Sequence, residues 1–267
     1  MMKRLFLTLL PLVSALLASS LTLSAQPSSW KPNPSEHHIK PSITRPAHSP
    51  YAGSVNYGKN IAVFGGSLSV NRESDVAKQI WADLLSCHVV TYGVGGAGFS
   101  SEQGYSLQRQ VDTADVHDVY VLWASTNDFN GNRPVGKWSD YTELDGYDRS
   151  KLNTQCGGIN YCIRTLRQKN PRAHIYFFTS LRFFSRESGY NPYSTDVNAT
   201  GKTFADYVQA QMECCRYHGV PVLDQFSQQD VDADNYEIYY LDDKLHMNEL
   251  GYRRAGFLQA SFLANGR

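Results

Sequence analysis

From Asn60 onward, short apolar runs alternate with amphipathic segments of helical length, and this alternation limits the folds available to the chain. The apolar runs are four or five residues long and lie at 61–64, 88–92, 119–123, 174–178 and 220–223. Segments with apolar residues at helical spacing lie at 75–85, 152–168, 204–217 and 250–263. Short apolar strands separated by helices are typical of parallel strands joined by right-handed crossovers. The pattern predicts one doubly wound, three-layer α/β/α domain on a parallel sheet of about five strands.

The composition agrees with a single globular domain and excludes several other classes of protein. Of the 267 residues, 42% are hydrophobic, which is too many for a disordered chain. The 25 basic residues are balanced by 25 acidic ones, so a nucleic-acid partner is not expected, because no cationic excess can neutralise phosphates. Five cysteines are too few for a disulfide framework and show no zinc-binding spacing, and their odd number leaves at least one thiol unpaired.

Residues 1–25 have the layout of a secretory signal peptide. Lys3 and Arg4 form a positive start, an apolar stretch follows, and small residues precede Ala25. We expect cleavage after Ala25, which makes the mature protein periplasmic or extracellular, with no stable membrane insertion. The alternative is an uncleaved anchor, which Pro11 and several serines in the apolar stretch make less favourable.

Residues 26–57 form a proline-rich segment ahead of the predicted domain, which spans 58–267. The segment holds six of the eleven prolines. Because proline fixes φ and lacks a backbone N–H, we expect an extended tether or a strap over the domain surface. His37 and His38 in this segment are expected to be solvated, since no third ligand stands at helical spacing to complete a metal site.

Polar residues gather where the predicted strands end, and in an open parallel sheet that edge carries function. The first strand ends in Gly65-Gly66-Ser67, which places Ser67 at a turn into a helix, with a helix-capping serine as the alternative. The second ends in the glycine-rich segment 93–98. Its glycine spacing resembles a dinucleotide site, but it follows the second strand rather than the first and lacks a good helix opening. A flexible turn that presents a backbone N–H to an anion is the preferred interpretation.

Two further motifs lie at later strand ends. Ser125-Thr126-Asn127-Asp128 follows the third strand, and Asn127 can aim its amide into the same crevice, with an ordinary turn as the alternative. Asp243 and His246 lie three residues apart before the last helix, so the carboxylate can orient the imidazole; a surface acidic turn is the alternative. A hydroxyl, an imidazole with its carboxylate and N–H donors together suit nucleophilic acyl transfer.

In this order the motifs resemble the blocks of the SGNH hydrolases, also called GDSL-type esterases, over residues 60–265. The Gly-Asp-Ser turn of that family is matched by 65–67, its glycine block by Gly96, its Gly-x-Asn-Asp block by 125–128 and its Asp-x-x-His block by 243–246. Two positions depart from the pattern. Gly66 stands where the family usually has Asp, and Ser125 where it usually has Gly. Neither departure removes a catalytic group, so the first bears on rate rather than on reaction type.

The resemblance implies a flavodoxin-like fold and a serine esterase mechanism. Ser67 would attack an ester carbonyl, His246 would take its proton, and Asp243 would hold the imidazole and stabilise its charged form. The backbone N–H groups of Ser67 and Gly96 and the side-chain amide of Asn127 would bind the oxyanion. No metal and no organic cofactor is required by this chemistry.

The substrate is predicted from two long insertions, 129–149 and 181–202, which leave carboxyl ends of strands and should flank the crevice. Their aromatic residues suit sugar rings, and the expected substrate contacts are Trp138, Tyr141, Phe183 and Tyr190. The alternative is that these aromatics pack the loops. We expect short-chain, mainly acetyl, ester hydrolysis on a carbohydrate or a small molecule. A lipase- or lysophospholipase-like esterase, an inactive carbohydrate-binding module and a dinucleotide enzyme are the alternative functions, and the oligomeric state is left open.

Overall fold

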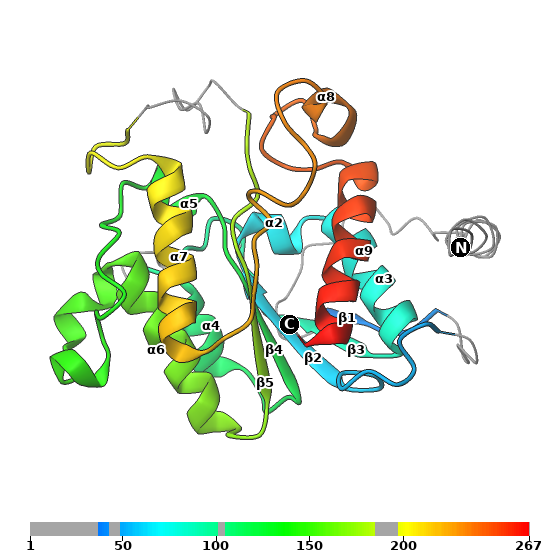
Figure 1. Ribbon diagram of the computed structural model, residues 1–267, viewed down its shortest axis with the longest axis horizontal. Coiled ribbons are helices and arrows are strands. Elements are labelled where there is room, and N and C mark those ends of the chain that lie inside the picture. The colour runs from blue at the N-terminus through cyan, green and yellow to red at the C-terminus, as the bar shows by residue number, and fades with distance from the viewer. Residues whose placement is uncertain (1–36, 43–48, 101–104, 185–196, 267) are drawn as a thin grey trace, which may run out of the picture. The chain divides into compact units, whose positions relative to one another are not determined.

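A sheet of short strands forms the centre of the fold (Figure 1). The computed structural model describes residues 37–42, 49–100, 105–184 and 197–266. Within these ranges the strands are β1 (His37–Ile39), β2 (Asn60–Gly65), β3 (His88–Thr91), β4 (Val119–Trp123), β5 (His174–Phe178) and β6 (Val222–Leu223). Their order across the sheet is β1-β3-β2-β4-β5-β6, and only the β1–β3 pair is antiparallel. The five parallel strands alone follow the order 2-1-3-4-5, so the predicted flavodoxin-like sheet is confirmed.

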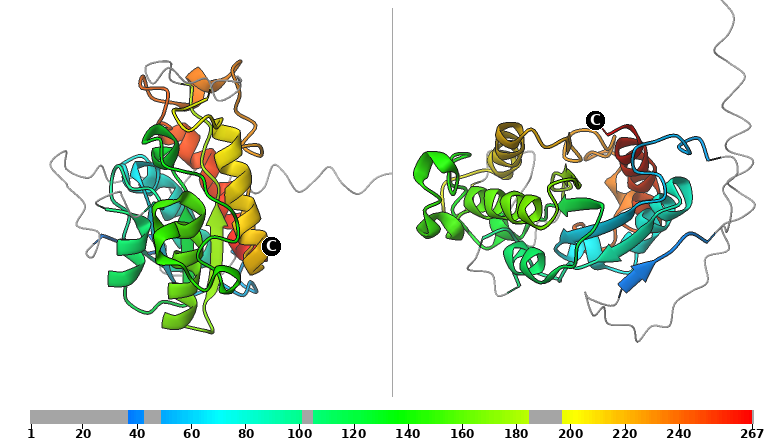
Figure 2. Two further views of the ribbon diagram at one scale, coloured as in Figure 1. Left: turned by 90° about the vertical axis from the view of Figure 1, so that its left-hand side faces the viewer. Right: turned by 90° about the horizontal axis from the view of Figure 1, so that it is seen from below.

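Helices cover both faces of the sheet, as Figure 2 shows from two further sides. The described helices are α2 (Ser67–Val70), α3 (Ser74–Leu85), α4 (Leu107–Thr113), α5 (Asn127–Asn130), α6 (Gln155–Lys169), α7 (Phe204–His218), α8 (Tyr236–Tyr239) and α9 (Glu249–Asn265), with short 3₁₀ turns η1 (Glu143–Asp145) and η2 (Arg149–Asn153). Alternate residues of β4 face opposite sides: Val121 packs in a cluster with α3 and α9, whereas Tyr120 and Leu122 pack with α4, α6 and α7. Strands buried on both faces explain the uniformly apolar runs in the sequence.

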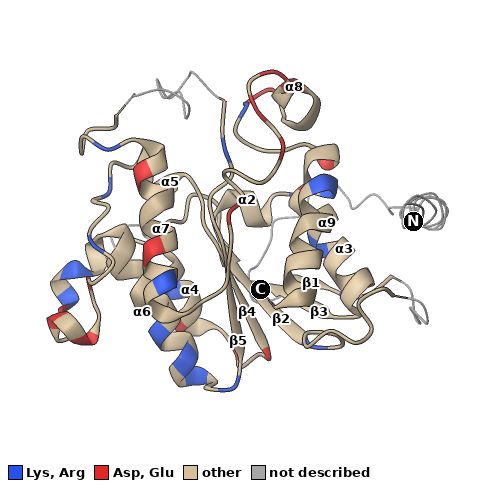
Figure 3. Cartoon of the chain, viewed as in Figure 1, with Lys and Arg blue, Asp and Glu red and all other residues tan. Residues whose placement is uncertain are grey.

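Charged residues lie on the helices and loops, and the described strands contain no Lys, Arg, Asp or Glu (Figure 3). Acidic and basic residues occur on both sides of the sheet rather than on one face. Within the described residues, no helix is long and apolar enough to cross a bilayer. The same residues contain no group of three His, Cys, Asp or Glu side chains that converges on a metal site. All five cysteines are buried free thiols.

Local signals set the ends of the longer helices. A capping box of Thr203 and Asp206 begins α7, and Gly219 ends it with φ +63°. Asn248 caps α9 by accepting a hydrogen bond from the N–H of Gly251 over 3.0 Å. The predicted helices at 204–217 and 250–263 therefore appear with shifts of no more than two residues at either end.

The segment ahead of the predicted domain differs from a free tether where the structure describes it. His37–Ile39 forms β1, which pairs antiparallel with β3 at the edge of the sheet. The side chain of His37 is only 8% exposed and contacts Asp75, so the expectation that His37 is solvated is wrong. Neither the predicted signal peptide at 1–25 nor Tyr190 falls within the described residues.

Candidate active site

Ser67 stands at the junction of a strand and a helix. β2 ends at Gly65 and α2 begins at Ser67, at the carboxyl edge of the sheet. The turn requires glycine at position 65, because a Cβ there would lie 2.5 Å from Ser69 Oγ and 2.7 Å from Trp123 O. Ser67 begins its helix, so its backbone N–H is among those without a partner inside the helix. The hydroxyl and this N–H therefore stand together at the edge where ligands bind in such sheets.

His246 connects Ser67 to Asp243 through two hydrogen bonds. His246 Nε2 lies 2.8 Å from Ser67 Oγ, and His246 Nδ1 lies 2.6 Å from Asp243 Oδ2. An ionised carboxylate can only accept hydrogen bonds, so Nδ1 carries the proton, and we assign the tautomer in which Nε2 accepts from the serine hydroxyl. Three residues predicted from two separate motifs are thus brought together in a hydrogen-bonded chain in which His246 can take the proton of Ser67.

The carboxylate of Asp243 is fixed by its own loop. Its Oδ1 accepts from the backbone N–H groups of Leu245 and His246, each over 2.9 Å. Burial on its own raises the pKa of Asp243, but the side-chain hydrogen bond from His246 and the two backbone N–H bonds outweigh it, and the pKa lies below its usual value. The group is therefore an ionised acceptor at neutral pH, which favours a positive charge on the imidazole.

The turn after β3 and the start of α5 meet beside the nucleophile turn. Gly96 has φ +82°, a left-handed conformation, and its backbone is exposed. Asn127 is the first residue of α5, and its Nδ2 donates to Ala97 O over 2.8 Å. A Cβ on Gly66 would lie 2.7 Å from that same Nδ2. The predicted oxyanion donors therefore come from elements that converge on Ser67.

Asp128 is a supporting residue that sequence reasoning did not assign. Its carboxylate is 1% exposed and accepts from the backbone N–H of Phe99 over 2.7 Å and of Ser100 over 3.0 Å. Burial raises the pKa of Asp128, and these two bonds act in the opposite direction. Its place as the last residue of the 125–128 block was the signal in the sequence. Asp128 ties α5 to the segment that follows the Gly96 turn.

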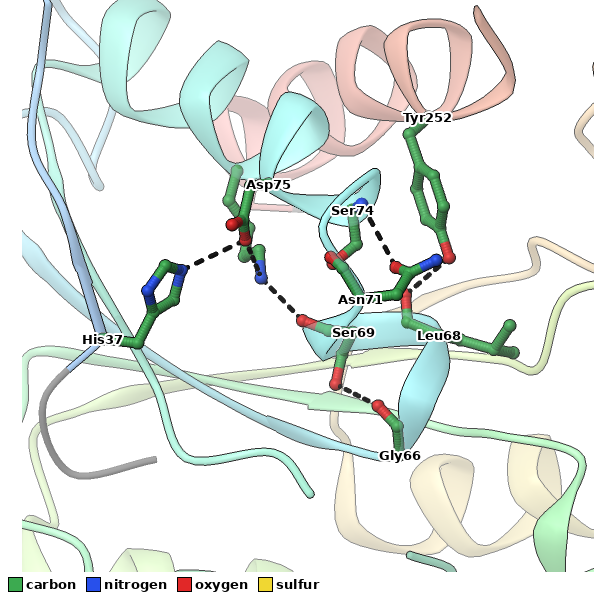
Figure 4. A network of polar contacts seen from close by, with 9 residues as sticks. His37, Gly66, Leu68, Ser69, Asn71, Ser74, Asp75 and Tyr252 are labelled. Carbon is green, nitrogen blue, oxygen red and sulfur yellow. Dashed lines mark hydrogen bonds and ion pairs between the residues drawn. The ribbon is translucent and has the colours of Figure 1, made fainter. Parts of the chain in front are cut away.

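A second set of unpredicted contacts holds α2 against the helices that pack on it (Figure 4). The carbonyl of Ser69 accepts from Lys78 Nζ over 2.6 Å, and the carbonyl of Leu68 accepts from the hydroxyl of Tyr252 over 2.9 Å. Lys78 is fully buried and pairs with Asp75 Oδ1 at 2.8 Å, and His37 Nε2 lies 3.1 Å from the same oxygen. The helix that begins at Ser67 is therefore anchored to α3, α9 and, through Asp75, to β1.

Trp138 and Tyr141 do not reach the site, which corrects their expected role as substrate contacts. The ring of Trp138 lies 5.2 Å from that of Tyr217, in the last turn of α7. α7 leads from the carboxyl edge back to the start of β6, and its 15 residues span about 22 Å. Tyr141 is 4% exposed and packs on Tyr161 of α6. The insertion folds back along these helices because Asn160 Nδ2 donates to Trp138 O over 2.8 Å.

Phe183 is also corrected, because it packs the loop rather than facing a substrate. Its side chain is 1% exposed and its ring lies 5.0 Å from that of Phe204 and 6.2 Å from that of Phe129. These rings belong to a small apolar cluster between α5 and α7. The loop-packing alternative therefore holds for Tyr141 and Phe183, whereas Trp138 is exposed beside Tyr217.

Comparison with known proteins agrees with this geometry. The model of the GDSL-like Lipase/Acylhydrolase family matches residues 62–254, and no curated protein matches the chain. The chain is similar to the crystal structure of a protein from Lactobacillus plantarum, at 21% identity over 78% of this chain and 97% of that one, with a TM-score of 0.64. It is also similar to the lipase/acylhydrolase from Enterococcus faecalis, at 16% identity over 77% of this chain and 95% of that one, with a TM-score of 0.53. These two structures support the fold, and the family match over most of the sequence shows that the chain belongs to the GDSL-like lipase/acylhydrolases, or SGNH hydrolases, which hydrolyse ester bonds.

Proposed function

We propose that the protein is a serine esterase in which Ser67 is the nucleophile, His246 the general base and Asp243 the residue that orients it. The observation that carries this proposal is the continuous chain of hydrogen bonds at 2.8 and 2.6 Å from Ser67 Oγ through the imidazole to Asp243. A serine hydroxyl is a weak nucleophile unless a base removes its proton, and this arrangement supplies one.

The chemistry proceeds in two balanced steps. Ser67 Oγ attacks the ester carbonyl carbon while its proton passes to His246 Nε2, and the oxyanion is bound by the N–H groups of Ser67 and Gly96 and by the amide of Asn127. The C–O bond to the alcohol then breaks, and the leaving oxygen takes the proton from His246. Water then attacks the acyl carbon while its proton passes to His246, the bond from that carbon to Ser67 Oγ breaks, and Ser67 takes the proton back as the acid leaves. Each oxyanion donor is typically worth about 10²–10³ in turnover.

A short acyl group is the proposed substrate preference. His246 contacts the Ser67 hydroxyl, and the polar side chains of Asn127 and Ser125 lie beside the neighbouring Gly66, whereas a long acyl chain gains binding energy only from apolar contacts. Trp138, Tyr141 and Phe183 give no support to a sugar-binding rim, so a carbohydrate alcohol rests on the resemblance and on the signal-like segment 1–25 alone. Export to the periplasm or the exterior rests on that segment as well.

The test is hydrolysis of aryl esters from acetate to octanoate by the purified 26–267 protein. Ser67→Ala should lower kcat by about 10⁶ with an unchanged melting temperature, because the nucleophile is lost and the fold is not. Ser150→Ala, at an exposed serine of η2, should keep wild-type activity. Ser67 is not the nucleophile if its variant retains a tenth of wild-type turnover.

The dependence of kcat/KM on acyl chain length distinguishes the proposed short-chain esterase from its alternatives. We expect kcat/KM to fall from acetate to octanoate. A value that rises with chain length favours the lipase-like alternative, and no turnover of any ester by the wild-type protein favours the inactive binding module.

A further inference from the structure

The side chain of Ser125 lies between the nucleophile turn and Asn127. Its hydroxyl donates to Ala97 O over 2.8 Å and accepts from Asn127 Nδ2 over 3.0 Å and from the backbone N–H of Asn127 over 3.3 Å. Asn127 Nδ2 also donates to Ala97 O over 2.8 Å. Ser125 is 6% exposed and Ala97 is fully buried, so water competes little for these bonds. Ser125 therefore contacts the proposed oxyanion donor directly.

The three atoms fix the direction of the Asn127 amide. Ala97 O, Ser125 Oγ and Asn127 Nδ2 form a nearly equilateral triangle with sides of 2.8, 3.0 and 2.8 Å. The two acceptors therefore subtend about 60° at Nδ2, whereas the two N–H bonds of a planar amide diverge by about 120°. Both acceptors therefore lie on the same side of Nδ2, and together they restrict rotation of the Asn127 amide and so the directions of its N–H bonds.

Residue 66 has no side chain, which leaves room for Ala97 O, the Asn127 amide and Ser125 together. A Cβ on Gly66 would lie 2.7 Å from Ala97 O, 2.7 Å from Asn127 Nδ2 and 3.0 Å from Ser125 Cβ. The contact with a backbone carbonyl cannot be relieved by a change of rotamer. Gly66 and Ser125 are also the two positions where the sequence departs from the blocks it resembles, and the structure sets them against each other. The residue types at positions 66 and 125 are therefore sterically linked.

We propose that Ser125 is a positioning residue that aims the amide of Asn127 at the oxyanion, and that Gly66 makes the room it needs. The inference rests on the proposed function, in which Asn127 binds the oxyanion. Without the Ser125 hydroxyl, Nδ2 loses one of its acceptors, and the amide gains freedom to rotate about its terminal torsion. The loss should appear in the transition state, where the oxyanion forms, rather than in substrate binding.

The test is a double-mutant cycle on aryl acetate hydrolysis by the 26–267 protein. Ser125→Ala should lower kcat about tenfold and leave KM within about twofold, as expected for a partly misaligned oxyanion donor. In the Asn127→Ala background the same change should alter kcat by less than about twofold, because no amide remains to be aimed. An equal loss in both backgrounds would show a merely structural role, and a kcat that rises in Ser125→Ala would show that the hydroxyl competes with the oxyanion.

A matched control separates loss of a buried hydroxyl from loss of positioning. Ser180 is fully buried, and its hydroxyl donates to Ser125 O over 2.8 Å. Ser180→Ala should therefore lower the melting temperature about as much as Ser125→Ala does, while kcat stays near wild type. If Ser180→Ala loses as much kcat as Ser125→Ala, the proposal is overturned.

The second half of the proposal is tested at Gly66. Gly66→Ala should lower kcat, and the loss should be smaller in a Ser125→Gly background, because one of the clashing atoms is gone and its neighbours can shift. Additive effects of the two changes overturn the coupling between these positions. Failure of this proposal can be told apart from failure of the proposed function. If Ser67→Ala is inactive and Asn127→Ala is slow, but Ser125→Ala has wild-type kcat, only the positioning role of Ser125 is contradicted.

Discussion

Gly95 and Gly96 are adjacent in the turn after β3 but differ in what their backbones allow. A Cβ on either residue would meet nothing within 4 Å, yet only Gly96 has a positive φ, of +82°. We predict that Gly96→Ala lowers kcat by about 10² with little change in KM, because the turn relaxes and moves the N–H that the proposed mechanism uses. Gly95→Ala is the matched control and should keep kcat within about twofold of wild type. Steady-state kinetics that show equal losses for the two variants would remove Gly96 from the oxyanion site.

The residues that stand closest to the proposed chemistry were predictable, and those that support them were not. Ser67, Asn127 and the Asp243–His246 pair each follow a strand or precede the last helix, and the parallel sheet brings such positions to one edge. Lys78 and Asp128 look like ordinary polar residues of a helix face and a turn in the sequence. Their roles arise from tertiary contacts with carbonyl and N–H groups of other segments, which no local pattern records.

At the scale of elements, continuous apolar runs predicted strands correctly, whereas segments of three or four residues were not predicted. The predicted run at 119–123 coincides with β4, since five buried residues in sequence leave little choice. β1 was missed because its three residues, two of them histidines, carry no apolar run, and its strand conformation comes from pairing with β3. α2, α5 and α8 have four residues each, too few to show a helical period.

The insertion at 129–149 shows where strand-end reasoning fails. It leaves the carboxyl edge as expected, but it then follows α6 and α7 away from that edge, held by Asn160 and by the contact of Trp138 with Tyr217. A loop's starting point is set by the strand before it. Its later course depends on partners that are remote in sequence, so aromatic content alone did not locate the substrate.

The buried pair of Asp75 and Lys78 joins α3 to the nucleophile helix. Burial lowers the pKa of Lys78, and the charge of Asp75 opposes this. We predict that Asp75→Asn lowers the free energy of unfolding by about 3 kcal/mol, because it leaves a buried ammonium without its counter-charge. Asp234→Asn, at an exposed aspartate, should change it by less than about 0.5 kcal/mol. Urea unfolding at pH 7 measures both.

The Asp75→Asn substitution should also change how the free energy of unfolding depends on pH. With Asp75 removed, the pKa of Lys78 in the folded protein falls further below its value in the unfolded chain. At pH values between these two pKa values, the unfolded chain holds a proton on Lys78 that the folded protein lacks. Stability must then rise with pH through that window, more steeply in Asp75→Asn than in wild type. Parallel stability curves for the two proteins would show that Lys78 does not depend on Asp75.

At the scale of the whole molecule, the site is assembled from distant parts of the chain. Ser67 and His246 are separated by 179 residues, and the latter lies just before α9, which packs against α3. The hydrogen-bonded chain therefore requires both the segment after β2 and the loop before α9 to be in their native places. Activity should consequently be lost together with the global fold rather than before it.

The antiparallel strand β1 has a consequence for self-association. β1 covers β3, whose Val89, Val90 and Thr91 are buried and whose backbone would otherwise present an open row of N–H and C=O groups. We predict that a 49–267 protein, which lacks β1, sediments as larger species than the 26–267 protein under the same conditions, while His37→Ala, which keeps the strand, does not. Identical sedimentation of the two proteins would show that the edge of β3 does not drive association when β1 is absent. Because the family match begins at residue 62, a domain boundary drawn from it would remove this strand and leave an adhesive edge that can template aggregation.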